Sequence, residues 1–357
     1  MKKLFALILA GALAVGTLTA CGSTAVVAVP QPEESAPPAS EPTQVSTPEN
    51  SGAAVKTGFY LSTDISGSKS AASDAEGFGQ ANLELVAVTI TDEGVIDSCV
   101  IDSIQSKITF DAAGKVTSGL TAPVLSKGEL GSDYGMVKAS SIGKEWNEQA
   151  QALADYVEGK TLEEIRGVAV TEEGKAADAD LAASVTVSIA GYLDAIEQAA
   201  ANATHLGAKQ GDTLMLTTST SIAGSKDAGA EGDGTAQTYA TVAAITMSGD
   251  VITSCTIDAV QADVNFDTTG AITTDLTAPV LSKNQLGDDY GMKKASSIGK
   301  EWYEQAAAFS AYVVGKTPEQ VAGIAVNEKG GAADADLAAS VTLSIGEFQT
   351  LVAKAGA

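Results

Sequence analysis

Hydrophobic and polar residues alternate along the first well-patterned part of the chain. The alternation runs through Leu83–Ile90 and, after a turn at Asp92–Gly94, continues through Val95–Ile101. A period of two places the apolar side chains on one face of a strand, so the pair is predicted to form a β-hairpin. Two shorter apolar runs, Phe59–Leu61 and Ile108–Phe110, predict further short strands on either side of it.

The period then lengthens to that of a helix. Apolar residues three or four positions apart predict a helix that ends at Gly159, with Ile142, Trp146, Ala150, Leu153 and Val157 on one face. The same spacing marks a later helix with Ile189, Tyr192, Leu193 and Ile196. A Ser or Thr three residues before Glu or Gln predicts a helix start, which occurs at Ser126, Thr161, Ser282, Thr317 and Ser344. Strands followed by helices are typical of an α+β fold.

The whole pattern occurs twice, with an offset of 156 residues. The letters AADADLAASVT stand at Ala176–Thr186 and again at Ala332–Thr342, and KASSIGKEW stands at Lys138–Trp146 and Lys294–Trp302. An offset of this size is that of a whole domain. We therefore predict two tandem homologous domains of α+β class. Each is expected to be a small, mostly antiparallel sheet packed with helices, and their predicted bounds are 56–205 and 206–357.

The start of the chain has the layout of a secretory signal. Lys2 and Lys3 precede an uncharged apolar run, Leu4–Val15, and small residues then lead to Cys21. Residues 1–20 are therefore predicted to be a signal peptide. The segment Leu18–Cys21 resembles the bacterial lipobox, which implies cleavage before Cys21 and diacylglycerol on its sulfur. An ordinary signal peptide followed by a chance cysteine is the alternative interpretation.

Residues 21–55 contain most of the prolines of the chain, together with Ser, Thr and Glu. Such a segment has too little apolar surface to offset the entropy of ordering, so it is predicted to be a disordered tether. With the lipid on Cys21, the tether would place the folded part on the extracytoplasmic face of the cell membrane.

Composition excludes several classes of function. The net charge is −24, and nucleic acid is therefore not an expected partner, because binding it needs a basic surface. His205 is the only histidine and lies between the repeats, so neither a His-ligated metal site nor a Ser-His-Asp triad can be built in both repeats. No metal and no catalytic residue is predicted. Cys99 and Cys255 occupy equivalent strand positions and are predicted to be buried thiols, one in each core.

Hydroxyl groups alternate with aliphatic side chains just before the last helix of the first repeat. Ser184, Thr186 and Ser188 share one face if this segment is extended. Asp178 and Asp180 lie upstream. One interpretation is a half-buried strand in which Ser188 or Ser344 caps a helix, and the other is a site where the hydroxyls hold an anion such as phosphate.

The segments Asp180–Thr186 and Asp336–Thr342 resemble the flavinylation motif of FMN-binding domains. That motif is Asp, two variable residues, Ser or Thr, Gly, Ala, then Thr or Ser. Ser184 stands where the family has Gly, and Val185 stands where it has Ala, so its larger side chain is expected to narrow access to the hydroxyl. In the family a flavin transferase takes FAD and links FMN through its phosphate to the final hydroxyl. The resemblance implies covalent FMN at Thr186 and Thr342, with Ser184 and Ser340 as alternates.

The plan of lipoprotein signal, acidic tether and two such domains is similar to the PplA type of flavinylated lipoprotein in extracellular electron transfer. The resemblance implies a redox carrier, itself the substrate of a flavin transferase and not an enzyme. It would pass electrons from a membrane flavoprotein that oxidises quinol to extracellular acceptors. The candidates for contact with the flavin ring are the aromatics Trp146, Trp302, Tyr134 and Tyr290. The candidates for contact with its phosphate are the lysines Lys138, Lys144, Lys294 and Lys300. The alternative is a non-redox surface lipoprotein that binds a small ligand or a cell-wall component, with a signal peptide that could also yield a pheromone.

Overall fold

The computed structural model describes residues 51–357, and all of them belong to one compact unit. The predicted signal peptide, Cys21 and the tether up to residue 50 lie outside the described residues. Within the described part, no helix is long and apolar enough to cross a membrane.

The described chain has an α+β fold with two three-stranded antiparallel sheets, as the sequence predicts. The first repeat contributes β1 (Lys56–Asp64), β2 (Gly77–Ile90) and β3 (Ile96–Phe110), in that order across the sheet. The second contributes β4 (Thr213–Ser221), β5 (Gly234–Ser248) and β6 (Val251–Phe266) in the matching order.

The predicted hairpin is present, but its strands are longer than the sequence indicates. The turn closes through hydrogen bonds between Thr91 and Val95, and Gly94 adopts a φ of 81° that favours glycine. The runs predicted as two strands, Val95–Ile101 and Ile108–Phe110, belong to one strand, β3. Polar residues between them do not interrupt the strand because β2 pairs with it along its whole length.

The helices follow each sheet in the same succession. In the first repeat they are α1 (Lys127–Leu130), η1 (Gly131–Tyr134), η2 (Met136–Lys138), α2 (Trp146–Val157), α3 (Leu162–Arg166), α4 (Ala179–Ala182) and α5 (Ala190–Ala201). In the second they are α6 (Lys283–Leu286), η3 (Gly287–Tyr290), η4 (Met292–Lys294), α7 (Trp302–Val313), α8 (Pro318–Ala322), α9 (Ala335–Ala338) and α10 (Gly346–Lys354).

Most predicted helix starts are confirmed. Capping boxes form at Ser126, Thr161, Ser282 and Thr317. The predicted cap at Ser344 is wrong, because the N-cap of α10 is Ile345, which makes no side-chain capping bond. The expected helix with Ile142 on its apolar face starts only at Trp146, and Ile142 lies in the preceding loop.

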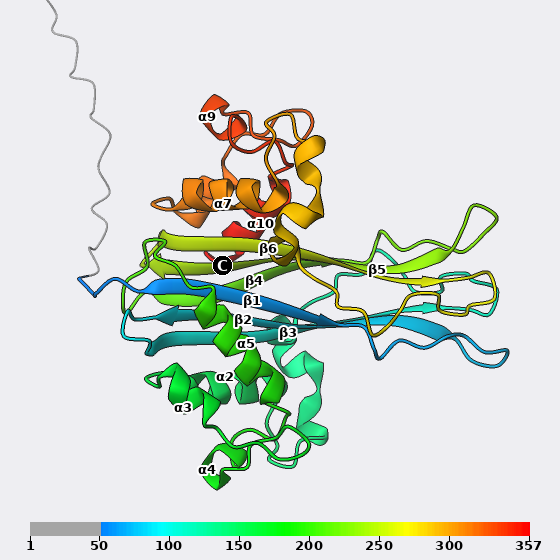
Figure 1. Ribbon diagram of the computed structural model, residues 1–357, viewed down its shortest axis with the longest axis horizontal. Helices are drawn as coiled ribbons and strands as arrows, with labels where there is room; N and C mark the ends of the chain where they lie inside the picture. Colours follow the sequence, from blue (N-terminus) through cyan, green and yellow to red (C-terminus); the bar gives the residue numbers. More distant parts are fainter. Residues whose placement is uncertain (1–50) are drawn as a thin grey trace, which may run out of the picture. The chain divides into compact units, whose positions relative to one another are not determined.

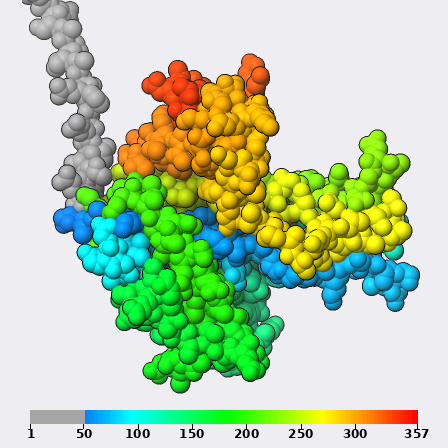
Figure 2. Space-filling model, in the orientation of Figure 1, coloured from blue at the N-terminus to red at the C-terminus, as the bar shows by residue number. Residues whose placement is uncertain are grey.

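The two sheets pack face to face, and the helices of each repeat cover the outer face of its own sheet (Figure 1). The shared core between the sheets contains Leu83 and Leu85 from one repeat and Val242 and Val264 from the other. Alternate residues of β2, such as Val86, point instead into the helix-covered core of their own repeat. The ends of the long strands extend beyond the helices (Figure 2).

Aromatic stacking joins the repeats at the far end of this shared core. The rings of Phe110 and Phe266 stack at 3.9 Å between centroids, and neither ring is exposed. Glycine opposite each ring is required for this, because a Cβ on Gly77 or on Gly234 would collide with the ring of its own repeat. The stacking therefore depends on the same pairing in both repeats, a glycine opposite a phenylalanine.

Hydrogen bonds between the repeats are reciprocal. The amide of Ala71 donates to the carbonyl of Gly270 at 2.8 Å, and the amide of Ala228 donates to the carbonyl of Gly114 at 2.8 Å. The connection between the repeats is also held, since Thr57 exchanges backbone hydrogen bonds with Thr204. Each repeat thus supplies the same kind of contact to the other.

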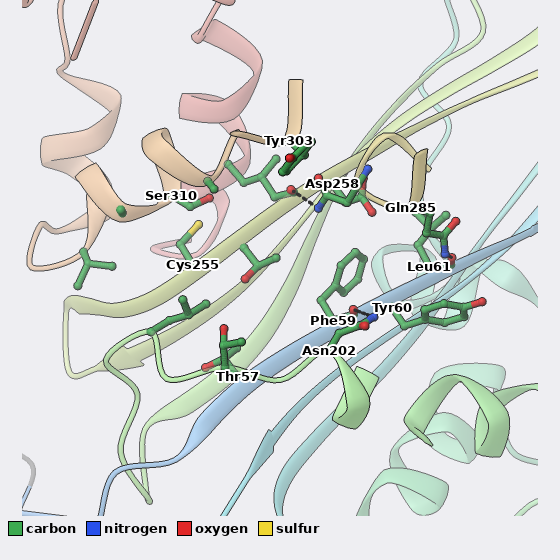
Figure 3. A pocket seen from close by; sticks show the side chains of 18 residues that line it. Thr57, Phe59, Tyr60, Leu61, Asn202, Cys255, Asp258, Gln285, Tyr303 and Ser310 are labelled. Carbon is green, nitrogen blue, oxygen red and sulfur yellow. Dashed lines mark hydrogen bonds between the residues drawn. The ribbon is translucent and has the colours of Figure 1, made fainter. Parts of the chain in front are cut away.

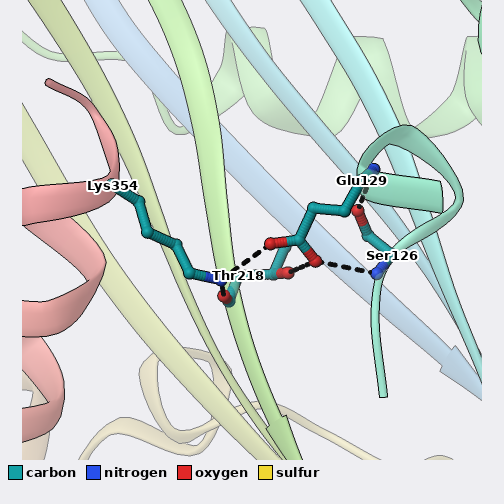
Figure 4. Close-up of polar contacts among 4 residues, drawn as sticks. All are labelled: Ser126, Glu129, Thr218 and Lys354. Carbon is teal, nitrogen blue, oxygen red and sulfur yellow. Dashed lines mark hydrogen bonds and ion pairs between the residues drawn. The ribbon is translucent and has the colours of Figure 1, made fainter. Parts of the chain in front are cut away.

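The polar cluster around Glu129 breaks the symmetry of the interface, because an uncharged residue takes the place of Glu129 in the second repeat. Glu129 accepts hydrogen bonds from the Thr218 hydroxyl at 2.9 Å, from the Ser126 amide at 2.9 Å, and from Lys354 at 2.7 Å (Figure 4). Burial raises the pKa of Glu129, but these bonds outweigh it and hold the pKa below its usual value. In the second repeat Gln285 takes the place of Glu129 and donates to the Leu61 carbonyl at 2.8 Å.

Candidate functional site

In each repeat, one glutamine connects the two sequence blocks that the repeats share. In the first repeat the Thr186 amide donates to Gln149 Oε1 at 2.8 Å, and the Thr186 hydroxyl donates to the same oxygen at 3.1 Å. Gln149 lies on α2, three residues after the KASSIGKEW block ends at Trp146, and Thr186 ends the AADADLAASVT block. The fold therefore holds the predicted site threonine by a contact across 37 residues.

Gln149 is completely buried, and all of its polar atoms are in use. Its amide nitrogen donates to Ser140 Oγ at 3.2 Å and to the Lys144 carbonyl at 3.1 Å. A buried amide with every donor and acceptor paired has one favourable orientation. Gln149 thus fixes the orientation of the Thr186 hydroxyl.

The second repeat reproduces this network. Gln305 Oε1 accepts from the Thr342 amide at 2.8 Å and from its hydroxyl at 3.0 Å. The Gln305 nitrogen donates to Ser296 Oγ at 3.3 Å and to the Lys300 carbonyl at 3.1 Å. Thr186 is half-buried and Thr342 is exposed, so solvent reaches both residues.

The segment before each threonine is not the extended strand that the alternation predicts. Asp178 caps α4 by accepting hydrogen bonds from the amides of Asp180 and Leu181, and Ser184 then lies in a turn. The inward alternation is nevertheless partly present, since Val185 is 1% exposed. Val185 therefore packs mainly into the core of its repeat, and it also lines part of the cavity beside Thr186.

The other serines of this segment have different roles. The Ser188 hydroxyl donates to the Gly174 carbonyl at 3.3 Å, and α5 has Ile189 as its N-cap without a side-chain bond. The predicted cap by Ser188 is therefore wrong, as it is for Ser344. Ser184 and Ser340, the alternates for modification, are half-buried, and their amides donate to the carbonyls of Leu181 and Leu337.

A cavity of about 580 Å³ opens beside Thr186. Thr186, Val185 and Ala182 line one part of it, and Glu172, Glu173 and Lys175 line another. Lys175 pairs with Glu173 at 2.8 Å, so the wall is not basic overall. A phosphate would gain little from this wall by charge alone.

The aromatic residues predicted near a flavin belong largely to the core. Trp146 and Trp302 are 3% and 4% exposed and pack against Tyr192 and Phe348. Tyr290 is 39% exposed. Lys138, Lys294, Lys144 and Lys300 are exposed or half-buried, and none of their ammonium groups has an ion pair among the described residues.

A buried lysine that sequence reasoning missed faces these aromatic rings. Lys283 Nζ lies 4.9 Å from the centre of the Trp302 ring and donates to the Tyr239 hydroxyl at 2.9 Å. Lys127 lies in the same way, 5.2 Å from the Trp146 ring. The available signal was the shared TAPVLSK segment, in which the lysine follows the capping serine.

Cys99 and Cys255 are free, buried thiols in the helix-covered core of each repeat, as predicted. Burial raises the pKa of both thiols well above the usual value, and that of Cys255 to about 12. Among the described residues no group of three or more His, Cys, Asp or Glu side chains is placed to hold a metal ion.

Comparison of the chain with family models, with curated proteins and with solved structures finds no match. The likeness to FMN-binding domains therefore depends on the motif and the plan of the chain.

Proposed function

We propose that the chain is a surface-anchored electron carrier made of two tandem homologous domains, with FMN covalently attached to Thr186 and Thr342. The observation that carries the proposal is the repeated Thr–Gln network. The same buried glutamine orients the same hydroxyl in both repeats, and both hydroxyls lie at positions that solvent reaches.

The geometry fits attachment through a phosphoester. The hydroxyl oxygen would attack the phosphorus on the riboflavin side of FAD and lose its proton, the bond from that phosphorus to the bridging oxygen would break, and AMP would leave. The Thr186 amide would still donate to Gln149 after this exchange, so the backbone would stay in place. The charged residues of the cavity wall are Glu172, Glu173 and Lys175, and Lys175 is paired with Glu173, so ionic contacts would not retain a phosphate there and a covalent bond would.

Bound FMN supplies the redox chemistry, and the chain supplies position. The lipid on Cys21 and the tether would keep both flavins close to the membrane electron donor, and extracellular acceptors would take the electrons. A covalent cofactor outside the cell is not lost by diffusion, and it stays at the concentration that its tether sets. Partners in this proposal are a flavin transferase, the membrane donor and the acceptors.

Intact mass measurement after co-expression with a flavin transferase tests the proposal. The wild-type chain should gain two FMN units, each less one water, and its denatured band should stay fluorescent. Thr186→Ala and Thr342→Ala should each remove one unit, and the double variant should remove both. Ser184→Ala with Ser340→Ala is the matched control and should keep two units.

If the serine pair loses the flavin and the threonine pair keeps it, the modified position is two residues away from the one proposed. A wild-type chain that never gains flavin would favour the alternative, a non-redox surface lipoprotein.

A further inference from the structure

A short turn of the chain forms part of the cavity wall beside Thr186. We call residues 171–175 the wall turn of the first repeat, and residues 327–331, at the offset of 156, the wall turn of the second. The side chains of the first wall turn that line the cavity include those of Glu172, Glu173 and Lys175. Their charges therefore lie beside the hydroxyl that would accept FMN.

The two wall turns have the same backbone geometry. In both, the amide of the first residue donates to the carbonyl of the fifth at 2.8 Å. In both, the carbonyl of the fourth residue accepts from the amide of the isoleucine three residues after the threonine, Ile189 at 2.7 Å and Ile345 at 2.9 Å. Each wall turn is thus held next to its own threonine in the same way.

The side chains of the two wall turns differ in charge. The first has two glutamates and one lysine, and the ion pair of Lys175 with Glu173 at 2.8 Å leaves one carboxylate without a cation. In the second, Lys329 stands in the place of Glu173 and Gly331 in the place of Lys175, so one glutamate and one lysine remain. The first wall turn has a net negative charge, and the second has none.

The same replacements open the second site. Lys175 lines the cavity beside Thr186, which is half-buried. Gly331 has no side chain to cover the site, and Thr342 is exposed. The hydroxyl of the second repeat is therefore at the more accessible of the two positions.

One carboxylate close to Thr342 in the sequence does not cancel this difference. Glu347, in the first turn of α10, corresponds to Gly191 of the first repeat. Glu84 fills that place instead, because a Cβ on Gly191 would lie 2.6 Å from its carboxylate. Both repeats thus have one carboxylate there.

Another charge difference between the repeats is too distant to matter. Val314 lines a separate cavity of about 460 Å³, between β1, β6 and α7, that contains neither threonine (Figure 3). The first repeat has Glu158 in its place, which accepts from the Cys99 amide at 3.0 Å. Glu158 follows Gln149 by nine residues, or about 13 Å of helix, and salt at about 0.1 M screens exposed charges beyond roughly 10 Å.

We infer that the two threonines are unequal acceptors and that Thr342 receives FMN before Thr186. This order of loading rests on the proposed function, in which each hydroxyl takes FMN from FAD. Whichever way the flavin ring points, the negative phosphates of FAD must reach the hydroxyl. The unpaired carboxylate of the first wall turn repels them, whereas Lys329 attracts them, and one surface charge changes a rate about two- to fivefold.

The loading rates of two single-acceptor chains test this order. Thr186→Ala leaves only Thr342, and Thr342→Ala leaves only Thr186. With a flavin transferase and FAD, intact mass at successive times should show the Thr186→Ala chain gaining its FMN about two- to fivefold faster. The ratio of the two rates should shrink when salt is raised to about 0.5 M, because salt screens the wall turns.

Charge changes on the wall turns identify the cause. Lys329→Glu in the Thr186→Ala chain should slow loading about two- to fivefold, and Glu173→Lys in the Thr342→Ala chain should speed it by a similar factor. Lys226→Glu is the matched control, because it makes the same change of charge in the exposed loop between β4 and β5. It should leave the loading of Thr342 unchanged.

Equal rates in two single-acceptor chains that both load completely, or faster loading of Thr186, would overturn the inference and leave the proposed function standing. Equal slowing by Lys329→Glu and Lys226→Glu would also overturn it, since the total charge of the chain would then set the rate. If neither chain gains flavin, the proposed function itself is wrong, and the order of loading falls with it.

Discussion

At the scale of single residues, the sequence singles out Thr186 and Thr342 as candidates, but the glutamines that hydrogen-bond to them could not be predicted. Gln149 and Thr186 are 37 residues apart, so no local spacing connects them. One signal was available: Gln149 lies within the apolar stripe of α2, next to Ala150 and one turn after Trp146. A polar residue inside an apolar face, repeated at Gln305, indicates a buried hydrogen-bonding role.

Buried carboxyl groups also escaped sequence reasoning, and one of them gives a prediction. Burial raises the pKa of Asp258 from 3.8 to about 6, although hydrogen bonds from Ser282 and Asn284 oppose the change. The folded chain therefore binds this proton more tightly than the unfolded chain. Stability from this group is fully present below pH 3.8 and is lost as the pH rises towards 6, by roughly 3 kcal/mol.

Asp258→Asn should remove that dependence, because the amide stays neutral and keeps the same shape. The free energy of unfolding, measured with urea from pH 4 to pH 7, should fall less steeply in the variant than in the wild type. Ser282→Ala removes one partner of the carboxyl and serves as a comparison. Parallel pH curves for wild type and Asp258→Asn would show that the proton is not held as described.

At the scale of elements, capping boxes read from the sequence form where no contact from a distant part of the chain competes with them. The boxes at Thr161 and Thr317 lie on exposed helix starts and form as predicted. At Ser344 the amide of the next residue, Ile345, donates instead to the Gly330 carbonyl at 2.9 Å. Because of this contact with a neighbouring turn, α10 begins at Gly346 with Ile345 as its N-cap. The capping pattern is present in the sequence, but Ser344 does not occupy the capping position.

A pair of variants on the second repeat separates the two cases. Thr317→Ala should lower the free energy of unfolding by about 1 kcal/mol. It should also speed hydrogen exchange at the Gln320 amide, which donates a hydrogen bond to the Thr317 hydroxyl at 3.2 Å. Ser344→Ala should change stability by less than about 0.5 kcal/mol, since Ser344 is exposed and caps nothing. An equal loss in both variants would mean that Ser344 does cap α10 in solution.

At the scale of the whole molecule, the repeat could be predicted but the packing of its copies could not. In β2, Val86 and Val88 lie on one face, and the opposite face carries Leu83 and Leu85, which are equally buried. A strand that is apolar on both faces is covered on both sides. The sequence does not say what covers the second face, and in the structure it is the sheet of the other repeat.

Separate expression of residues 56–205 and 206–357, the two predicted domains, tests how much each repeat depends on this contact. Each half keeps its own sheet and helix-covered core, so each should unfold cooperatively. Each half alone would leave its face of the shared core uncovered and should unfold at a lower urea concentration than the full chain. Mixed in equal amounts, the halves should form a 1:1 complex by size-exclusion chromatography and recover most of the lost stability.

Phe266→Ala in the second half should weaken that complex by about 3–5 kcal/mol, because Phe266 stacks on Phe110. Halves that stay monomeric when mixed, each as stable as the full chain, would mean that the shared core contributes nothing to stability.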